Sequence, residues 1–243
     1  MARYTQMLIG VAVYLLFLAT FLYLIGFVGD LVVPRTIDAG PAAPQDIALA
    51  IDIALIVLFG VQHSVMARRG FKTAWTRVVP LALERSVYVA VTSLVLIVLM
   101  ALWRPIPAPV WSVAGAGAIV LWVLFAIGWG MVLLSTFLIN HFELFGLEQL
   151  WRQLRALPAA GPQFREPLFY RWVRHPLYFG FILAFWATPR MTVSHLLLAL
   201  GMTIYILIAI RFEERDLLAS IGAPYADYRR RVGMLFPGLG RAR

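Results

Sequence analysis

The sequence predicts an all-α integral membrane protein. We expect four transmembrane helices, then a C-terminal transmembrane helical hairpin and a cytoplasmic C-terminal cap. Of the 243 residues, 62% are hydrophobic and only 14% are charged, and the mean hydropathy is +0.83. Soluble domains are closer to roughly half apolar and a quarter charged. The chain also contains several apolar runs near the length of about 20 residues that a helix needs to cross a bilayer.

Each expected helix follows from one such run. The four full-length runs cover residues 6–29, 46–66, 86–103 and 112–138. The first run has no small-residue cleavage site and is too long for a signal peptide, so we expect it to remain in the mature protein. Region 177–211 contains a short apolar arm, a polar break at 188–192 and a longer apolar run, which is the pattern of a hairpin with a short first arm.

The linkers between these helices are rich in proline and glycine. They cover residues 30–45, 104–110 and 156–167. No internal repeat of 20–50 residues is visible. The sequence therefore predicts a single polytopic domain over residues 1–243.

The distribution of basic residues predicts the orientation. If the N-terminus is cytoplasmic, all but three of the 21 lysines and arginines fall in cytoplasmic segments, the exceptions being Arg35, Arg104 and Arg190. Such a bias is typical of cytoplasmic loops, so we expect both termini inside, in a bacterial inner membrane. The net charge of +9 then indicates contact with anionic lipids. The arginines are scattered over several loops, which argues against a nucleic-acid partner.

Polar residues gather at one expected depth, near the cytoplasmic ends of the helices. Ionisable groups are costly at membrane depth, so they tend to pair, to reach the interface or to line a site. Single arginines there are explained by interfacial snorkelling, but a set with histidines and carboxylates predicts a polar pocket. The main members are Gln62, His63, Glu84, Arg85, Asn140, His141, Glu143, Arg174, His175, Tyr178, Arg211, Glu213 and Glu214.

Two motifs carry most of the chemistry. The run Arg174-His175-Pro176-Leu177-Tyr178-Phe179-Gly180 opens the hairpin, and Glu213-Glu214 closes it. Pro176 suits the first turn of a helix, and the amides at such a helix start can bind a carboxylate. Tyr178 can present an aromatic face to a cation, and Gly180 permits a close approach of the backbone.

These motifs resemble the C-terminal cofactor site of the integral-membrane methyltransferases, a superfamily that includes isoprenylcysteine carboxyl methyltransferases, phospholipid methyltransferases and their nurim-like relatives. The tail Gly222-x-x-Tyr225-x-x-Tyr228-Arg-Arg-Arg-Val also matches their pattern. The resemblance implies that residues 140–237 hold most of an S-adenosylmethionine site, with Arg211 facing the substrate. The implied cofactor-binding residues are Tyr170, Arg174, His175, Pro176, Tyr178, Gly180, Glu213 and Glu214.

Motifs nearer the N-terminus are similar to the nurim-like branch. They are Gln62-His63-Ser64, Glu84-Arg85-Ser86, Trp103-Arg104-Pro105 and Asn140-His141-Phe142-Glu143-Leu144-Phe145-Gly146. Within that branch they look most like the bacterial enzymes that methylate methanethiol to dimethyl sulfide. The resemblance implies a small volatile thiol as substrate and membrane lipids as surroundings, with no obligate protein partner.

Methyl transfer to a thiol requires a thiolate, which is the nucleophile, and needs no metal. Free thiols ionise with a pKa near 8.5, so a base or a cation should lie close to the acceptor. His141 is the first candidate base, with Glu143 orienting it. His63 and Arg85 are the alternatives from the facing helices.

Other functions stay open. A methyltransferase with a prenyl-cysteine or phospholipid acceptor would need a larger, lipid-facing groove. A non-catalytic nurim-like membrane protein would have no affinity for the cofactor. The absence of Gly-x-Gly-x-x-Gly after a strand argues against a dinucleotide-type methyltransferase fold, and the four histidines show no obvious axial pair for haem.

Overall fold

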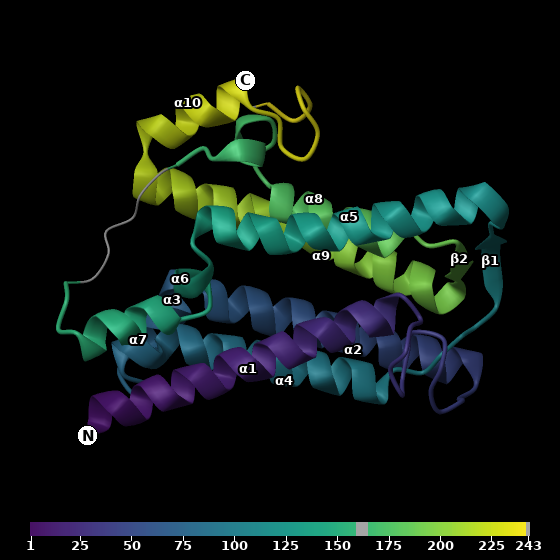
Figure 1. The fold of residues 1–243 in the computed structure, drawn as a ribbon, viewed down its shortest axis with the longest axis horizontal. Coiled ribbons are helices and arrows are strands. Elements are labelled where there is room, and N and C mark those ends of the chain that lie inside the picture. Colours follow the sequence, from purple (N-terminus) through teal and green to yellow (C-terminus); the bar gives the residue numbers. More distant parts are fainter. Residues whose placement is uncertain (159–164, 242–243) are drawn as a thin grey trace. The chain divides into compact units, whose positions relative to one another are not determined.

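The computed structural model describes residues 1–158 and 165–241. Within them, five helices are long and apolar enough to cross a membrane (Figure 1). They are α1 (Ala2–Val28), α2 (Gln45–Ala67), α4 (Glu84–Leu102), α5 (Gly115–Ile139) and α9 (Val193–Ile221). The chain is therefore a multi-pass membrane protein, and the first four of these helices begin and end within a few residues of the four full-length predicted runs.

Region 177–211 has the expected unequal arms. Helix α8 (Pro176–Trp186) spans 11 residues, whereas α9 spans 29. A helix of 11 residues is too short to cross a bilayer core of about 30 Å at 1.5 Å per residue. The predicted count of four spans plus a transmembrane hairpin, and the cytoplasmic cap, remain predictions.

The described residues are mostly helical, as expected, and they include two short strands that the sequence did not predict. β1 (Pro109–Ser112) and β2 (Arg190–Thr192) pair in a two-stranded sheet. The fourth apolar run was expected to be helical from residue 112, but α5 begins at Gly115. A proline at 109 followed by Val110 and Trp111 favours extended backbone, because Pro lacks a donor and β-branched and aromatic residues suit strands.

The remaining elements are short helices in the connections. These are α3 (Arg69–Trp75), η1 (Leu81–Leu83), α6 (His141–Leu144), α7 (Leu147–Leu154), η2 (Leu168–Arg171) and α10 (Ala223–Arg231). The predicted linker 156–167 lies partly outside the described residues.

The chain forms two compact units, each built from three stretches of sequence. Unit 1 comprises Met1–Val110, Phe142–Ala159 and Met191–Leu198, and unit 2 comprises Trp111–His141, Ala160–Arg190 and Ala199–Arg243. Each unit is described separately below.

Unit 1 packs α1, α2, α4 and α7 around aromatic side chains. The ring centroids of Phe17 and Phe145 are 3.9 Å apart. At the other end of the unit, Trp103 donates from Nε1 to the carbonyl of Ile37 at 3.2 Å. Asp52, fully buried in α2, accepts a 2.9 Å hydrogen bond from the backbone N–H of Arg104. These contacts attach the loop after α1 and the end of α4 to the helices.

In unit 2, α5 and α8 lie in very close contact at two glycines. A Cβ on Gly180 would come within 2.8 Å of the carbonyl oxygen of Gly128, and a Cβ on Gly128 within 2.7 Å of the backbone nitrogen of Ala184. Small residues allow such backbone contact between membrane helices. This packing holds the start of α8, where the site is found, against a long helix.

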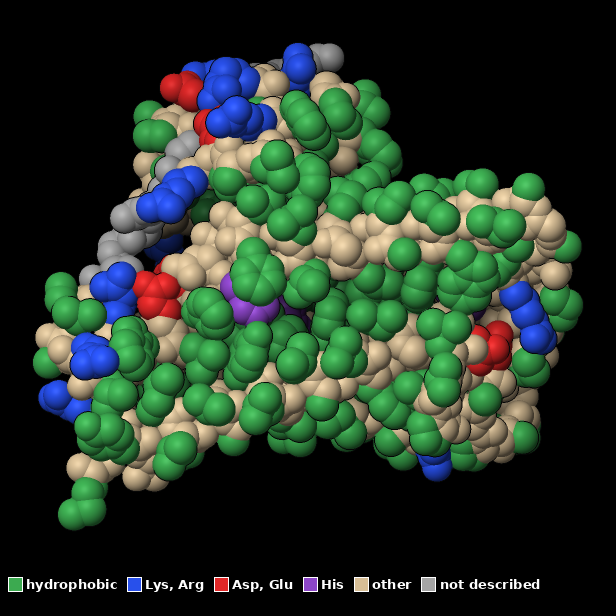
Figure 2. All heavy atoms as spheres, in the orientation of Figure 1, with side chains coloured by type: hydrophobic (Ala, Val, Ile, Leu, Met, Phe, Trp, Pro, Cys, Tyr) green, Lys and Arg blue, Asp and Glu red, His purple; other side chains and the backbone are tan. Residues whose placement is uncertain are grey.

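Figure 2 shows hydrophobic side chains over the exposed flanks of the long helices. Large apolar residues such as Ile53, Val57 and Val61 of α2, and Ile119 and Val123 of α5, are about half exposed. Exposed apolar surface of this extent marks an interaction site, here with lipid.

Candidate functional site

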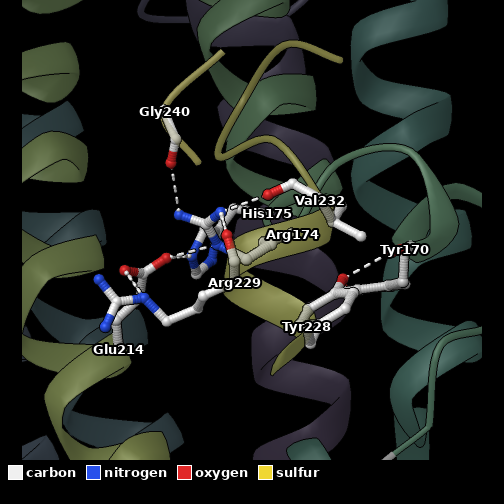
Figure 3. A network of polar contacts seen from close by, with 8 residues as sticks. All are labelled: Tyr170, Arg174, His175, Glu214, Tyr228, Arg229, Val232 and Gly240. Carbon is white, nitrogen blue, oxygen red and sulfur yellow. Dashed lines mark hydrogen bonds and ion pairs between the residues drawn. The ribbon is translucent and has the colours of Figure 1, made fainter. Parts of the chain in front are cut away.

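Three of the predicted cofactor residues, Arg174, His175 and Glu214, meet in unit 2 (Figure 3), where α8 begins and the second half of α9 passes. Arg174 donates from Nε to Glu214 Oε1 at 2.7 Å, and His175 Nε2 lies 3.1 Å from the same oxygen. Arg229 of α10 lies 3.1 Å from Glu214 Oε2. The side chains of Arg174, His175 and Glu214 are nearly completely buried. One carboxylate therefore joins three segments of the chain, at residues 174–175, 214 and 229.

Arg174 also binds the C-terminal segment (residues 232–240). Its guanidinium donates to the carbonyls of Arg229 at 3.2 Å, Gly240 at 3.0 Å and Val232. With the bond to Glu214, these account for four of the five N–H groups of an arginine. Arg174 is thus already occupied by the protein, and its role here is to hold Glu214 and this segment in place.

The backbone strengthens the same connection. Val173 and Gly233 form a parallel β-bridge. The N–H of Arg174 donates to the carbonyl of Gly233 at 2.8 Å, and the N–H of His175 to that of Met234 at 3.2 Å. The C-terminal segment consequently lies along the residues that lead into α8.

The start of α8 has the geometry that the motif predicted. His175 is the N-cap and Pro176 the first helical residue, and no side chain caps the helix. The Tyr178 ring lies 5.6 Å from the His175 ring. A helix start with uncapped first-turn amides favours an anionic group.

Tyr170 lies at the edge of this cluster. Its carbonyl accepts a 2.6 Å hydrogen bond from the hydroxyl of Tyr228. Burial raises the pKa of the Tyr170 hydroxyl above its usual range, and the negative charge of Glu213 adds to the shift. Tyr170 therefore stays protonated at any physiological pH, close to the second carboxylate of the predicted pair.

Two of the predicted residues have other surroundings. The backbone that approaches Gly180 closely belongs to α5, through Gly128, so the structure gives this glycine a role in helix packing. Arg211 is exposed on α9. Their predicted parts in cofactor and substrate binding remain predictions.

The first candidate base, His141, also belongs to unit 2 and follows the end of α5. Its side chain is buried, and the ring stacks on Phe137 with centroids 4.1 Å apart. Nδ1 lies 2.8 Å from Thr136 Oγ1, and that hydroxyl lies 2.6 Å from the carbonyl of Leu133. Since the hydroxyl proton goes to the carbonyl, Thr136 accepts from His141, so Nδ1 carries the proton and Nε2 the lone pair.

Burial also lowers the pKa of His141 below its ordinary value of 6.5. The imidazole is therefore neutral at neutral pH. The partner of Nδ1 is Thr136, and the expectation that Glu143 orients this histidine remains a prediction. Glu143 is exposed, and its carbonyl accepts from Gly146 and Gln149.

The alternative base candidates belong to unit 1. His63 Nε2 lies 2.8 Å from the Tyr88 hydroxyl, and Nδ1 lies 3.3 Å from Thr92 Oγ1. The guanidinium of Arg85 lies over the Tyr88 ring at 5.8 Å. His63 and Arg85 therefore both contact Tyr88, which agrees with the expectation that they lie on facing helices.

The sequence did not indicate three residues that contact the predicted site residues: Thr136, Tyr228 and Arg229. Arg229 and Tyr228 lie in the tail pattern, so their positions in the Tyr-x-x-Tyr-Arg-Arg-Arg run could have indicated them. Thr136 lies within an apolar helix, and its only sequence signal is a hydroxyl five residues before a histidine.

Comparison with known proteins agrees with the motifs. The chain is 55% identical to methanethiol S-methyltransferase of Mycobacterium tuberculosis over 98% of both chains. It is 50% identical to methanethiol S-methyltransferase 2 of Bradyrhizobium diazoefficiens, over 98% of this chain and 92% of the relative. Nurim of Pan troglodytes is 34% identical over 70% of this chain and 68% of its own.

Neither a family model nor a solved structure matches the chain. The family therefore follows from relatives of nearly the same length whose identity extends through both units. The chain belongs to the methanethiol S-methyltransferase family.

Proposed function

We propose that this protein transfers a methyl group from S-adenosylmethionine to methanethiol, giving dimethyl sulfide, at the cytoplasmic face of the membrane. The observation that carries the proposal is the convergence of Arg174, His175 and Glu214 at the uncapped start of α8. Relatives that match nearly the whole chain are named methanethiol S-methyltransferase.

The donor set around α8 fits this cofactor. The first-turn amides behind Pro176 suit its carboxylate, and the rings of Tyr170 and Tyr178 suit a cationic sulfonium. The carboxylates of Glu213 and Glu214 suit its amino and ribose hydroxyl groups. When bound, the cofactor supplies a methyl group made electrophilic by the sulfonium. Because Arg174 already binds protein oxygens, we assign it a positioning role toward Glu214.

His141 is the residue that we assign to the thiol proton. A neutral imidazole with its lone pair on Nε2 can accept that proton, and Thr136 holds the other nitrogen as a donor. The charged thiolate that results is the reactive form. Burial lowers the pKa of His141 below its ordinary value, which favours the neutral imidazole that the role of base requires.

One assay tests the reaction. Purified protein in detergent is supplied with methyl-labelled S-adenosylmethionine and methanethiol, and dimethyl sulfide is measured for wild type and His141→Ala. The variant should lose roughly 10²-fold or more in turnover, the usual lower range for a general base, with nearly unchanged cofactor affinity. The loss should shrink as the pH rises toward the pKa of the free thiol, since the acceptor then ionises without help. A defect that does not vary with pH would remove His141 from this role.

The proposed orientation has its own test. Reporter fusions after Gly240 and within residues 104–110 should report opposite sides of the membrane, because the basic residues are so unevenly distributed. A C-terminus on the outer side would place the α8 cluster away from cytoplasmic cofactor and would contradict the proposal.

A second candidate function rests on a cavity in unit 1. A space of about 520 Å³ is lined mostly by apolar side chains: Met7, Phe142, Leu147, Trp151 and Leu157, with Glu148 and Arg152. Cavities of 300–1,000 Å³ hold larger ligands, so this one favours a prenyl-cysteine or phospholipid acceptor. The same labelled assay, supplied with a prenyl-cysteine or phosphatidylethanolamine, separates the two functions: transfer to either in place of methanethiol would favour the second.

A further inference from the structure

A small cavity in unit 2 lies where the end of α5 meets the segment that leads into η2. It has a volume of about 60 Å³, and its walls are formed by Leu138, Ile139, Arg165, Pro167 and Tyr170. The cavity walls include one residue near the candidate base and one residue of the predicted cofactor site. Ile139 precedes His141 by two residues, and Tyr170 belongs to the cofactor cluster through its bond with Tyr228.

The volume restricts what can bind there. On this measure a single water needs roughly 10–15 Å³, so the cavity has space for a few atoms. Drug-sized ligands occupy cavities of roughly 300–1,000 Å³, so this cavity is too small to enclose S-adenosylmethionine, a prenyl-cysteine or a phospholipid. One side is open, since Ile139 is 51% exposed. Methanethiol, with one carbon and one sulfur, is of the right size.

The walls also match the chemistry of a small thiol. Leu138, Ile139 and Pro167 present apolar surface, which suits a methyl group. Arg165 contributes a positive charge, and a nearby cation lowers the pKa of a thiol. Arg165 is exposed, so solvent weakens this effect. Tyr170, whose pKa is raised by burial and by Glu213, keeps its proton and can donate a hydrogen bond to a thiolate.

We propose that this cavity is the acceptor site, and that Leu138 sets the upper limit on the size of the thiol. The inference rests on the proposed function, because the acceptor must be a thiol. It adds the location of the acceptor and the residues that select it. Binding in the cavity places the thiol between the end of α5, which leads to His141, and the tyrosine at the edge of the cofactor cluster.

Two substitutions test the proposal through substrate size. Leu138→Ala enlarges the cavity, so kcat/KM for ethanethiol relative to methanethiol should rise on the order of 10-fold, the lower range for one methylene in an apolar pocket. Leu138→Phe fills it, so kcat/KM for methanethiol should fall by a similar factor. The affinity for S-adenosylmethionine, measured by calorimetry, should stay at the wild-type value in both variants and shows that they are folded. Leu134→Ala is the matched control, because Leu134 is an exposed leucine of the same helix outside the cavity walls.

A binding measurement separates failure of this inference from failure of the proposed function. Saturation-transfer NMR with ¹³C-methanethiol should show contact with wild type and Leu134→Ala, and loss of that signal in Leu138→Phe. If wild type binds the thiol in this way but forms no dimethyl sulfide, the proposed function fails and only a thiol-binding cavity remains. Equal signals in Leu138→Phe and Leu134→Ala, or an unchanged thiol preference in Leu138→Ala, would overturn the acceptor site.

Discussion

Two histidines, one in each unit, have different kinds of hydrogen-bond partners. His175 in unit 2 shares the carboxylate of Glu214 with two arginines. His63 in unit 1 contacts the hydroxyls of Tyr88 and Thr92 within a long apolar helix pair. The first cluster pairs its histidine with a carboxylate at helix ends, whereas the second gives its histidine hydroxyl partners, with the Arg85 guanidinium over the ring of Tyr88.

The difference follows from the cost of burying charge. A buried charge is stable only when it is paired and hydrogen-bonded, and the start of α8 can supply both because arginines and backbone carbonyls meet there. Such a site can exchange one charged partner for a charged ligand. Hydroxyl hydrogen bonds between helices, as at His63, are better suited to fixing the packing of α2 against α4.

The largest expected effect is a loss of folding stability on replacement of Arg174. Arg174→Ala leaves Glu214 without its closest partner and three carbonyls without a donor, so we expect a loss of about 3–5 kcal/mol, the usual cost of breaking a buried ion pair. Unfolding in detergent measures it. Arg230→Ala, which removes an exposed partner of Asp227, should change stability by roughly 0–1 kcal/mol at most. Similar losses in both variants would contradict the assigned role of Arg174.

A smaller effect should follow from changing Thr136. Thr136→Val removes the acceptor for His141 Nδ1–H, so the tautomer with the proton on Nε2 gains population and turnover should fall about 10-fold, equivalent to about 1.4 kcal/mol. Thr136→Ser keeps the hydroxyl and should restore most of the rate. The pH profile is the decisive readout, because a purely structural defect would lower the rate equally at all pH values and would not be rescued by serine.

His141 also predicts how stability depends on pH. Burial lowers its pKa in the folded protein below the value of 6.5, so the unfolded chain binds the proton more readily. Its contribution to stability should be complete above pH 6.5 and should decline as the pH falls below that value. Thermal unfolding of wild type and His141→Gln should therefore converge toward acidic pH. Parallel curves would show that the histidine does not titrate in this way.

The smallest effect is expected in unit 1. Tyr88→Phe removes one hydrogen bond to His63, which is typically worth about 1 kcal/mol. It should leave the affinity for S-adenosylmethionine unchanged if this cluster only stabilises the helices. Calorimetry on the variant checks this. A clear loss of affinity would show that the His63 cluster also takes part in cofactor binding.

The sequence predicted the membrane spans well, because apolar runs of this length are rare outside helices that cross a bilayer. It also predicted that Arg174, His175 and Glu214 would meet, from the motif at the start of α8 and the Glu pair. It did not predict that Arg174 would donate to three backbone carbonyls near the C-terminus. Any residue type can supply a backbone carbonyl, so such partners cannot be recognised in a sequence. The role of Thr136 was likewise invisible, because it depends on the direction of one hydroxyl bond.

The short strands β1 and β2 were missed for a related reason. A run of apolar residues does not distinguish an extended start from a helical one, and the pairing partner of Pro109–Ser112 lies about eighty residues further along the chain. Contacts at such separation are decided by tertiary packing, which local patterns do not record.

The central claim is that the Glu214 cluster at the start of α8 binds S-adenosylmethionine, whereas the His63 cluster in unit 1 does not. Calorimetry on wild type, His175→Ala, Glu214→Gln and His63→Ala tests it directly. The account predicts micromolar-range binding that weakens on the order of 100-fold, about 2.7 kcal/mol, in the first two variants and stays near wild type in His63→Ala. Wild-type affinity in both His175→Ala and Glu214→Gln, or the absence of binding to the wild-type protein, would contradict it.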